Sequence, residues 1–394
     1  MTSRPPIVTL KPQAVKRFKT GHPWIFSNEL VRMPKELEPG LIVDLKSHSG
    51  AWIGRGYFNP RSLIAVRILT REPVEIDEIF FETKLQQAQS LRERWLPDET
   101  AYRIVFGEAD GLPGLVIDRY GSVLVTQFLT AGMDRLIEPV VRVLVKRFQP
   151  AAVVARNDTA ARGLEGLPQE KRLLYGEVPS PLVIDKNGLS FEVDVWEGQK
   201  TGFFLDQSKN YRCLEEWANG ARVLDAFCYT GAWGLHAARY GAKSVLGMDS
   251  SERAILQSRA NAERNGLGPV CRFVKEDVFE GLRRLQSAGE RFDLIVLDPP
   301  AFAKSRPKVK EAIRGYKEIN RLAMMLLSPN GLLITCSCSH LIGPEMFRDM
   351  LVSSAADAQR SFYIADWRTQ GRDHPIALGI PETQYLKCVL LQAR

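Results

Sequence analysis

Cysteine and histidine are scarce in this chain of 394 residues, which has 6 and 5 of them, with no CxxC pair and no metal-ligand spacing. Zinc sites and disulfide frameworks need such clusters, so we predict neither, and no bound metal. No stretch approaches the roughly 18 apolar residues of a membrane helix. The first residues also lack the apolar core of a signal peptide. We therefore expect a cytoplasmic protein with free thiols and no membrane association.

Positive charge is in excess, and one end of the chain holds all of it. Residues 1–72 contain 12 Lys and Arg against 5 Asp and Glu, which accounts for the whole formal net charge of +7. A locally basic surface favours a polyanion such as RNA or DNA, or an anionic membrane. An ordinary solvated face explains the charge equally well.

Turn signals and apolar periodicity divide the chain into three segments. Residues 1–72 carry short β-like runs such as "IVTL", "LIVDL" and "LIAVRIL", separated by turns, and predict a small β-rich module. Residues 73–185 read as a mixed α+β region without a cluster of catalytic side chains. In residues 186–394, apolar strands and helices alternate regularly, which predicts an α/β fold with a doubly wound, largely parallel sheet.

In such a sheet, ligands bind outside the carboxyl ends of the strands, where the strand order reverses. A single Asp at the end of a strand is usually a helix cap. Five polar groups at one edge are hard to explain by capping alone. The five predicted strand ends carry, in order, Asp225, Asp249, Asp277, Asp298 and Cys338.

The loop after the first of these strands indicates the type of cofactor. It contains Gly231 but no GxGxxG fingerprint, which disfavours a dehydrogenase. Asp249 follows Gly231 by 18 residues, near the offset at which an acid binds ribose hydroxyls. S-adenosylmethionine, which has a ribose and no pyrophosphate, fits better than a dinucleotide. Asp277 either receives the adenine amine or caps the following helix, and both interpretations stay open.

The fourth and fifth strand ends carry the residues that indicate chemistry. In "DPP", two prolines fix the backbone and turn Asp298 out of the strand, where it can face a planar substrate. Neighbouring strands would bring Cys338 to the same pocket, and a thiolate beside a helix N-terminus is a competent nucleophile. The remaining cysteines are interpreted as buried and structural: Cys213, Cys228, Cys271, Cys336 and Cys388.

These residues resemble a known family. "DAFCYTGAWG", "DPPAF" and "TCSCS" look like motifs of class I S-adenosylmethionine-dependent methyltransferases. With "GQKTGFFLDQSKN", "EADGLPGLVIDRY", "HPWIF", "GYFNPRS" and "YLKCVLL", they resemble the bacterial large-subunit rRNA cytosine methyltransferase I family over essentially the whole chain. The resemblance implies an N-terminal RNA-binding PUA domain (residues 1–72), a central α+β domain (73–185) and a Rossmann-like methyltransferase domain (186–394).

The resemblance also implies a reaction at carbon 5 of a cytosine in RNA. Cys338 would attack carbon 6 of an extruded base, and Asp298 would hold the base by its Watson–Crick edge. Phe302, Pro299 and Pro300 would contact the base. The residues implied for S-adenosylmethionine are Asp225, Phe227, Tyr229, Gly231, Asp249 and Asp277, with Phe204 and Gln207 closing over it.

One departure and three open questions accompany this interpretation. Many related enzymes carry a second cysteine where this chain has Pro300, so the base that removes the proton is unassigned, with Asp298 as a candidate. A methyltransferase acting on a guanine nitrogen would use the same DPP motif without a cysteine. An RNA-binding or assembly protein with an inactive methyltransferase fold is an alternative of another class. The partner is expected to be large-subunit rRNA or its assembly intermediate, and a homodimer stays open.

Overall fold

A computed structural model describes residues 4–303 and 305–394, which form two compact units that we describe separately. The chain passes between the units several times, so each unit combines segments that are distant in sequence. Unit 1 contains the described residues up to Ile184, with Val193–Leu205 and Arg372–Thr383. Unit 2 contains Asp185–Glu192, Asp206–Gly371 and Gln384–Arg394.

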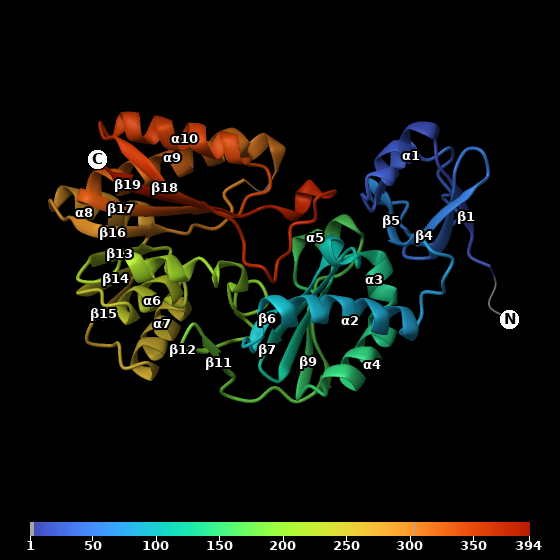
Figure 1. The fold of residues 1–394 in the computed structure, drawn as a ribbon, viewed down its shortest axis with the longest axis horizontal. Helices are drawn as coiled ribbons and strands as arrows, with labels where there is room; N and C mark the ends of the chain where they lie inside the picture. The colour runs from blue at the N-terminus through green and yellow to red at the C-terminus, as the bar shows by residue number, and fades with distance from the viewer. Residues whose placement is uncertain (1–3, 304) are drawn as a thin grey trace. The chain divides into compact units, whose positions relative to one another are not determined.

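The N-terminal part of unit 1 is a five-stranded sheet in the order β1-β3-β4-β5-β2 (Figure 1). This confirms the β-rich module expected there. "HPWIF", which the sequence analysis did not assign to a strand, contains the short strand β2, which pairs antiparallel with β5 at the edge of the sheet. The elements are β1 (Ile7–Thr9), α1 (Pro12–Lys19), β2 (Trp24–Phe26), β3 (Ile42–Lys46), β4 (Trp52–Phe58) and β5 (Ile64–Thr70).

A second five-stranded sheet in unit 1 has the order β10-β9-β8-β7-β6, with only β8 and β9 parallel. Strands β6 and β7 form an antiparallel hairpin around "EADGLPG". The elements are α2 (Glu78–Trp95), β6 (Ala101–Phe106), β7 (Leu115–Tyr120), β8 (Val123–Phe128), α3 (Ala131–Arg135), α4 (Ile137–Phe148), β9 (Ala152–Arg156), α5 (Ala160–Leu164) and β10 (Lys171–Gly176), followed by the pair β11 (Val183–Lys186) and β12 (Leu189–Glu192).

Buried polar contacts join the two sheets of unit 1. The Arg67 guanidinium lies 2.9 Å from a Glu165 carboxylate oxygen, and the Asn59 amide donates to the other oxygen at 2.8 Å. The Tyr57 hydroxyl donates to the Pro113 carbonyl at 2.8 Å. Because buried polar groups must find partners, these contacts specify one arrangement of the two sheets.

Unit 2 is built on a seven-stranded sheet in the order β15-β14-β13-β16-β17-β19-β18. Strands β13 to β17 are mutually parallel, and β19 runs antiparallel between β17 and the edge strand β18. This confirms the doubly wound α/β fold. The strands are β13 (Arg222–Ala226), β14 (Ser244–Asp249), β15 (Cys271–Lys275), β16 (Phe292–Leu297), β17 (Leu327–Ser337), β18 (Phe362–Arg368) and β19 (Lys387–Ala393).

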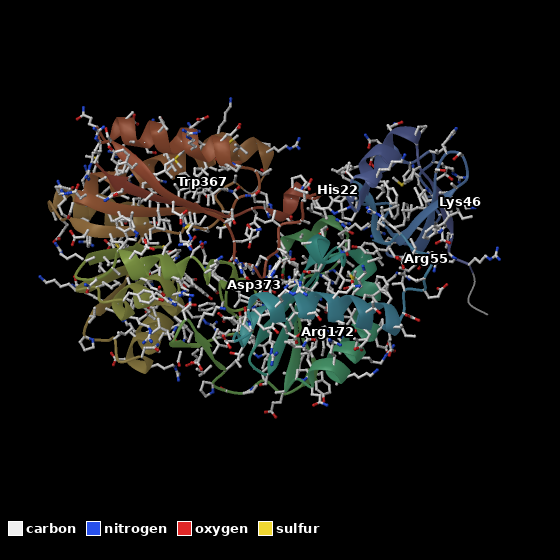
Figure 2. The ribbon with its side chains drawn as sticks, in the orientation of Figure 1. His22, Lys46, Arg55, Arg172, Trp367 and Asp373 are labelled. Carbon is white, nitrogen blue, oxygen red and sulfur yellow. The ribbon has the colours of Figure 1, made fainter. Side chains whose placement is uncertain are left out.

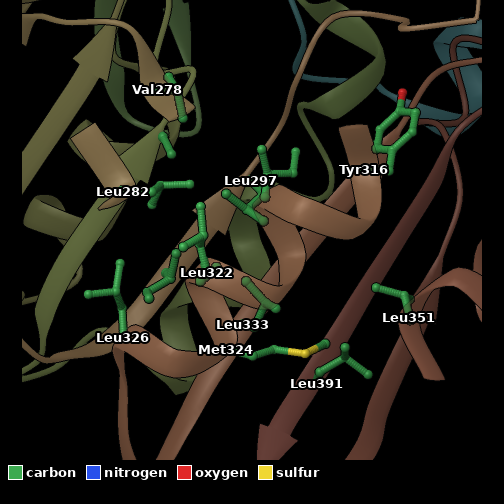
Figure 3. Packing of buried hydrophobic residues seen from close by; sticks show 14 of the residues in the cluster. Val278, Leu282, Leu297, Tyr316, Leu322, Met324, Leu326, Leu333, Leu351 and Leu391 are labelled. Carbon is green, nitrogen blue, oxygen red and sulfur yellow. The ribbon is translucent and has the colours of Figure 1, made fainter. Parts of the chain in front are cut away.

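Helices cover both faces of this sheet, which is why its central strands are mostly apolar. Helices α8, α9 and α10 share one buried cluster with the strands, in which Leu297 and Leu333 pack with Leu322 (Figure 3). Helices α6 and α7 lie on the other face (Figure 1). The helices are α6 (Ala232–Arg239), α7 (Glu252–Arg264), α8 (Val278–Ser287), α9 (Val309–Leu326) and α10 (Pro344–Asp357).

Candidate active site at the carboxyl edge of the unit 2 sheet

The strand order of unit 2 reverses between β13 and β16. In doubly wound sheets, ligands bind outside the carboxyl ends of the strands at such a reversal. In the parallel register, Ala226 pairs with Leu297, and Leu297 pairs with Thr335. The segments that follow β13, β16 and β17 therefore emerge together at one edge. This is where the sequence analysis placed its catalytic and cofactor residues.

The loop after β13 has an unusual backbone. Phe227 and Tyr229 have φ angles of 65° and 48°, in the left-handed region that non-glycine residues rarely adopt. Such residues cost about 1–3 kcal/mol each and cluster at functional sites. Gly231 has a φ of 86°, and a Cβ there would come within 2.9 Å of the Phe273 ring. Glycine is thus required at this turn by backbone angle and by packing.

Asp249 holds this loop in place. Its carboxylate accepts the Tyr229 amide N–H on Oδ2 at 3.0 Å and the Ser251 amide N–H on Oδ1 at 2.8 Å. The residue is half-buried at the end of β14. Asp249 therefore links two loops of the carboxyl edge, and its expected role toward a ribose stays a prediction.

Asp277 lies two residues beyond β15 and caps α8, because its Oδ1 accepts the Glu280 amide N–H at 3.2 Å. The sequence left capping and adenine binding open, and the structure shows the cap. The side chain is also exposed, and a contact with adenine stays a prediction.

Asp225 lies within β13 and is fully buried. Its Oδ2 accepts the Gly234 amide N–H at 2.8 Å, near the start of α6. Among the described residues, its Oδ1 has no hydrogen-bond partner. Burial raises the pKa of Asp225 to about 7, opposed by the Gly234 hydrogen bond. A buried carboxylate oxygen without a partner at a sheet edge fits a ligand that brings its own donors.

Two side chains orient Asp298, which directly follows β16. The Gln207 amide and the Trp233 indole N–H both donate to its Oδ2, each at 3.0 Å. Gln207 and Trp233 are buried, whereas Asp298 is half-buried. The family resemblance predicts Gln207 at the cofactor, and no role was predicted for Trp233. The position of Trp233, two residues after Gly231 of the loop, was a signal in the sequence that could have indicated its place at the site.

The two prolines after Asp298 differ in exposure: Pro299 is buried and Pro300 is exposed. Phe302 is half-buried in a cluster of rings. Its ring centroid lies 4.6 Å from that of Tyr316 and 6.3 Å from that of Phe227. Phe302 thus joins the DPP segment to the loop after β13, and its stacking on a base stays a prediction.

Cys338 directly follows β17 and is half-buried, whereas Cys336 is buried within the strand opposite Cys388. Since β16 and β17 are neighbours, Asp298 and Cys338 both follow adjacent strands at the same edge of the sheet, and their sharing one pocket stays a prediction. Burial raises the pKa of Cys336 well above its ordinary value, so that thiol is inert. The structure thus separates Cys338 from its buried neighbour. Cys271, which was predicted to be buried, is half-buried as well.

Phe204 belongs to unit 1, unlike the other predicted site residues. There the Lys200 ammonium lies 4.5 Å from the centre of its ring. Its expected role in closing over the cofactor stays a prediction.

Within the described parts of the chain, no group of three His, Cys, Asp or Glu side chains is placed to hold a metal ion. No described helix has the length and apolarity needed to cross a membrane.

Two family models match this chain. Residues 8–71 match a PUA-like domain, and residues 158–373 match an S-adenosylmethionine-dependent methyltransferase. Two solved structures share the fold over 98% of this chain and 100% of theirs. One is a methyltransferase complexed with SAH (TM-score 0.86, 23% identity) and the other a SAM-dependent methyltransferase from Streptococcus mutans (TM-score 0.84, 22%). The protein is an S-adenosylmethionine-dependent methyltransferase, and its cofactor is S-adenosylmethionine.

The curated relatives that match this chain carry a more specific name than methyltransferase. A ribosomal RNA large subunit methyltransferase I from Shewanella amazonensis is 42% identical over 385 residues, covering 96% of this chain and 97% of the relative. Its counterpart from Tolumonas auensis is 41% identical over 392 residues, covering 98% and 99%. The chain belongs to the ribosomal RNA large subunit methyltransferase I family. This confirms the family resemblance seen in its motifs, whereas the reaction at carbon 5 of a cytosine stays a prediction.

Proposed function

We propose that this protein methylates carbon 5 of a cytosine in large-subunit ribosomal RNA through a covalent bond to Cys338. The observation that carries the proposal is the pairing of two groups at one sheet edge: Cys338 after β17 and the oriented carboxylate of Asp298 after β16. The relatives bear the name of a large-subunit rRNA methyltransferase, and the PUA-like module carries the basic excess of the chain.

The residues of the carboxyl edge suit the cofactor. Asp225 offers a buried carboxylate oxygen to a donor, and Asp249 stands where an acid meets a ribose. The left-handed backbone of Phe227 and Tyr229, with Gly231, shapes the loop between these two acids. S-adenosylmethionine, when bound, supplies an electrophilic methyl group on a sulfonium ion. We assign Asp225, Asp249 and this loop to holding it, with Gln207 and Phe204 beside it and Asp277 toward the adenine.

Methylation of an aromatic carbon needs activation, and Cys338 provides it. The thiolate attacks carbon 6 of the extruded cytosine, a sulfur–carbon bond forms, and the electron pair of the 5,6 double bond moves to carbon 5. Carbon 5 takes the methyl group from the sulfonium sulfur, whose bond to that methyl carbon breaks, so the sulfur leaves as the neutral thioether S-adenosylhomocysteine. A base, for which Asp298 is the candidate, removes the carbon 5 proton, which restores the double bond and expels the thiolate. Asp298 binds the Watson–Crick edge of the base, and Pro299, Pro300 and Phe302 shape its pocket.

The division of the chain follows the division of tasks. Residues 1–72 bind RNA, residues 73–185 form the central domain, and residues 186–394 carry the chemistry in the cytoplasm. This assignment rests on the basic excess before residue 73 and on the candidate site after residue 205.

Substitution of the nucleophile tests the proposal. Cys338→Ala should abolish 5-methylcytosine formation in rRNA, and RNA containing 5-fluorocytosine should form a covalent adduct with the wild-type protein but not with Cys338→Ala. Cys336→Ala, two residues away and buried, is the matched control and should retain the adduct. Mapping 5-methylcytosine in rRNA from cells with and without the gene identifies the nucleotide. A fully active Cys338→Ala enzyme would show instead a methyltransferase acting on a base nitrogen, and no methylation at all would indicate an RNA-binding protein.

A further inference from the structure

The motif "YLKCVLL" at the end of the chain has no role in the reaction described so far. Its lysine, Lys387, opens β19 and pairs with Ser337 of β17, the residue just before Cys338. The side chain is 4% exposed. A lysine this buried is rare and costs free energy unless its charge is used or compensated.

The contacts of Lys387 point to the segment that carries Cys338. Its ammonium donates to the Ser339 carbonyl at 2.7 Å and to the Tyr385 carbonyl at 2.8 Å. An ammonium group has three donors. Among the described residues no third acceptor and no carboxylate partner is present for it. One N–H and the net charge of Lys387 are therefore uncommitted, next to the residue after Cys338.

Electrostatics couples the two groups. Burial lowers the pKa of Lys387 to about 8, and the charge of Cys338 acts in the opposite direction. Because a coupling between two sites is reciprocal, the Lys387 ammonium must favour the thiolate of Cys338 by the same free energy. A nearby cation is the usual means of activating a cysteine nucleophile.

Other titratable groups face this part of the site, and the carboxyl group of Asp298, the phenol of Tyr316 and the thiol of Cys336 carry no positive charge that could stabilise a thiolate. Asp298, after β16, has a carboxyl group, which cannot supply a positive charge. Tyr316 of α9 has its pKa raised by burial and stays neutral. His340 packs its ring 5.2 Å from that of Tyr385, and the Cys336 thiol within β17 is protonated. Lys387 is the buried cation that β19 contributes.

We propose that Lys387 is a positioning residue that fixes the backbone after β17 through Ser339 and stabilises the thiolate of Cys338 with its ammonium charge. The proposal deepens the proposed function and rests on it for its purpose, because the attack on carbon 6 requires the thiolate. Its physical content concerns the free enzyme and needs no RNA.

Alkylation of the full-length protein measures this directly. The rate of iodoacetamide modification of the Cys338 peptide, followed by mass spectrometry between pH 5 and 10 without RNA, gives the midpoint of thiol ionisation. We expect Lys387→Met to raise that midpoint by about one pH unit or more. Lys387→Arg, which keeps a positive charge, should remain closer to the wild type. Lys186→Met removes another buried lysine of unit 2 and should leave the midpoint unchanged.

An unchanged midpoint in a folded Lys387→Met protein overturns the inference, and so does an equal rise in the Met and Arg variants, since that would reflect packing alone. Folding is checked by S-adenosylmethionine binding. If Lys387→Met does not fold, the wild type decides: a midpoint at or above about 8.5, the ordinary thiol value, also overturns it. Failure to form 5-methylcytosine with a shifted midpoint would remove the proposed function and leave the Lys387 assignment standing.

Discussion

Charged side chains are prominent both in the N-terminal segment and at the carboxyl edge of the unit 2 sheet, but they differ in their exposure to solvent. In the first, the excess charge is carried by exposed side chains such as Lys19 and Lys35. At the second, single charged groups such as Asp225 and Lys387 are buried and have shifted pKa values. Solvated charges act at long range and are screened by salt, whereas buried charges act on one neighbour. The N-terminal charges therefore suit long-range attraction of a charged partner, whereas the buried charges of the sheet edge suit chemistry at one site.

Part of the N-terminal charge is structural. Arg55 and Lys46 both lie on the first sheet (Figure 2), yet Arg55 is buried and pairs with Asp44, with its Nε 2.8 Å from Oδ1. Arg67 pairs with Glu165 in the same way. Deleting residues 1–72 would therefore leave Glu165 buried without its partners and disturb the rest of unit 1. Substituting exposed lysines is the cleaner way to test the basic surface.

The largest effect expected outside Cys338 comes from Asp298. Asp298→Ala removes the carboxylate that Gln207 and Trp233 orient, so the base loses its positioning. We expect kcat/KM to fall by about 10²–10³-fold. Methyl transfer to RNA measures this, and Asp366→Asn, an exposed carboxylate of β18, is the control. A loss below threefold would show that the DPP segment does not hold the substrate.

Asp225 should show a smaller effect, on the cofactor. Asp225→Asn removes a buried carboxylate oxygen, and we expect the Kd for S-adenosylmethionine to rise about tenfold to a hundredfold. Since a cationic ligand favours the ionised carboxylate, binding to the wild type near pH 6 should release a proton. Calorimetry in buffers of different ionisation enthalpy detects this release. Equal proton release in Asp225→Asn would show that another group titrates.

The same residue predicts a pH dependence of stability. The folded-state pKa of Asp225, about 7, lies above its ordinary value of 3.8. Its contribution to stability is therefore fully present below pH 3.8 and is lost as the pH rises through about 7. Urea unfolding without cofactor measures this. Over this pH range, the free energy of unfolding of the wild type should fall relative to that of Asp225→Asn. A constant difference would contradict the assignment.

The smallest effect belongs to the basic surface. The double variant Lys19→Glu and Lys35→Glu should weaken RNA binding severalfold at low salt and reduce the salt slope of binding by about 1–2. Cofactor binding should not change. The matched control reverses the charges of Lys243 and Arg291 by substitution with Glu. Both residues are exposed and lie just before β14 and β16, at the edge of the unit 2 sheet opposite to its carboxyl edge. Equal losses in both double variants would show that the N-terminal segment has no special role.

Much of the site could be predicted because strand ends are visible in sequence. Asp249, Asp298 and Cys338 follow apolar runs, and parallel strands carry such residues to one edge whatever the loops do. The short strand β2 was missed because three residues between turns carry no periodicity. Trp233 and Lys387 were missed because each looks like an ordinary helix or strand residue until its hydrogen-bond partner is known.

The sequence by itself determined the alternation of strands and helices in residues 186–394, the acids at the strand ends, the family and the location of the basic excess, because these depend on local patterns of residues. Only the tertiary structure decided which of those groups meet. Long-range pairing places Lys387 beside Ser337 and turns Gln207 and Trp233 toward Asp298. Burial, which no local pattern measures, leaves one carboxylate oxygen of Asp225 without a hydrogen-bond partner among the described residues, and it makes Cys338 differ from Cys336 two residues earlier.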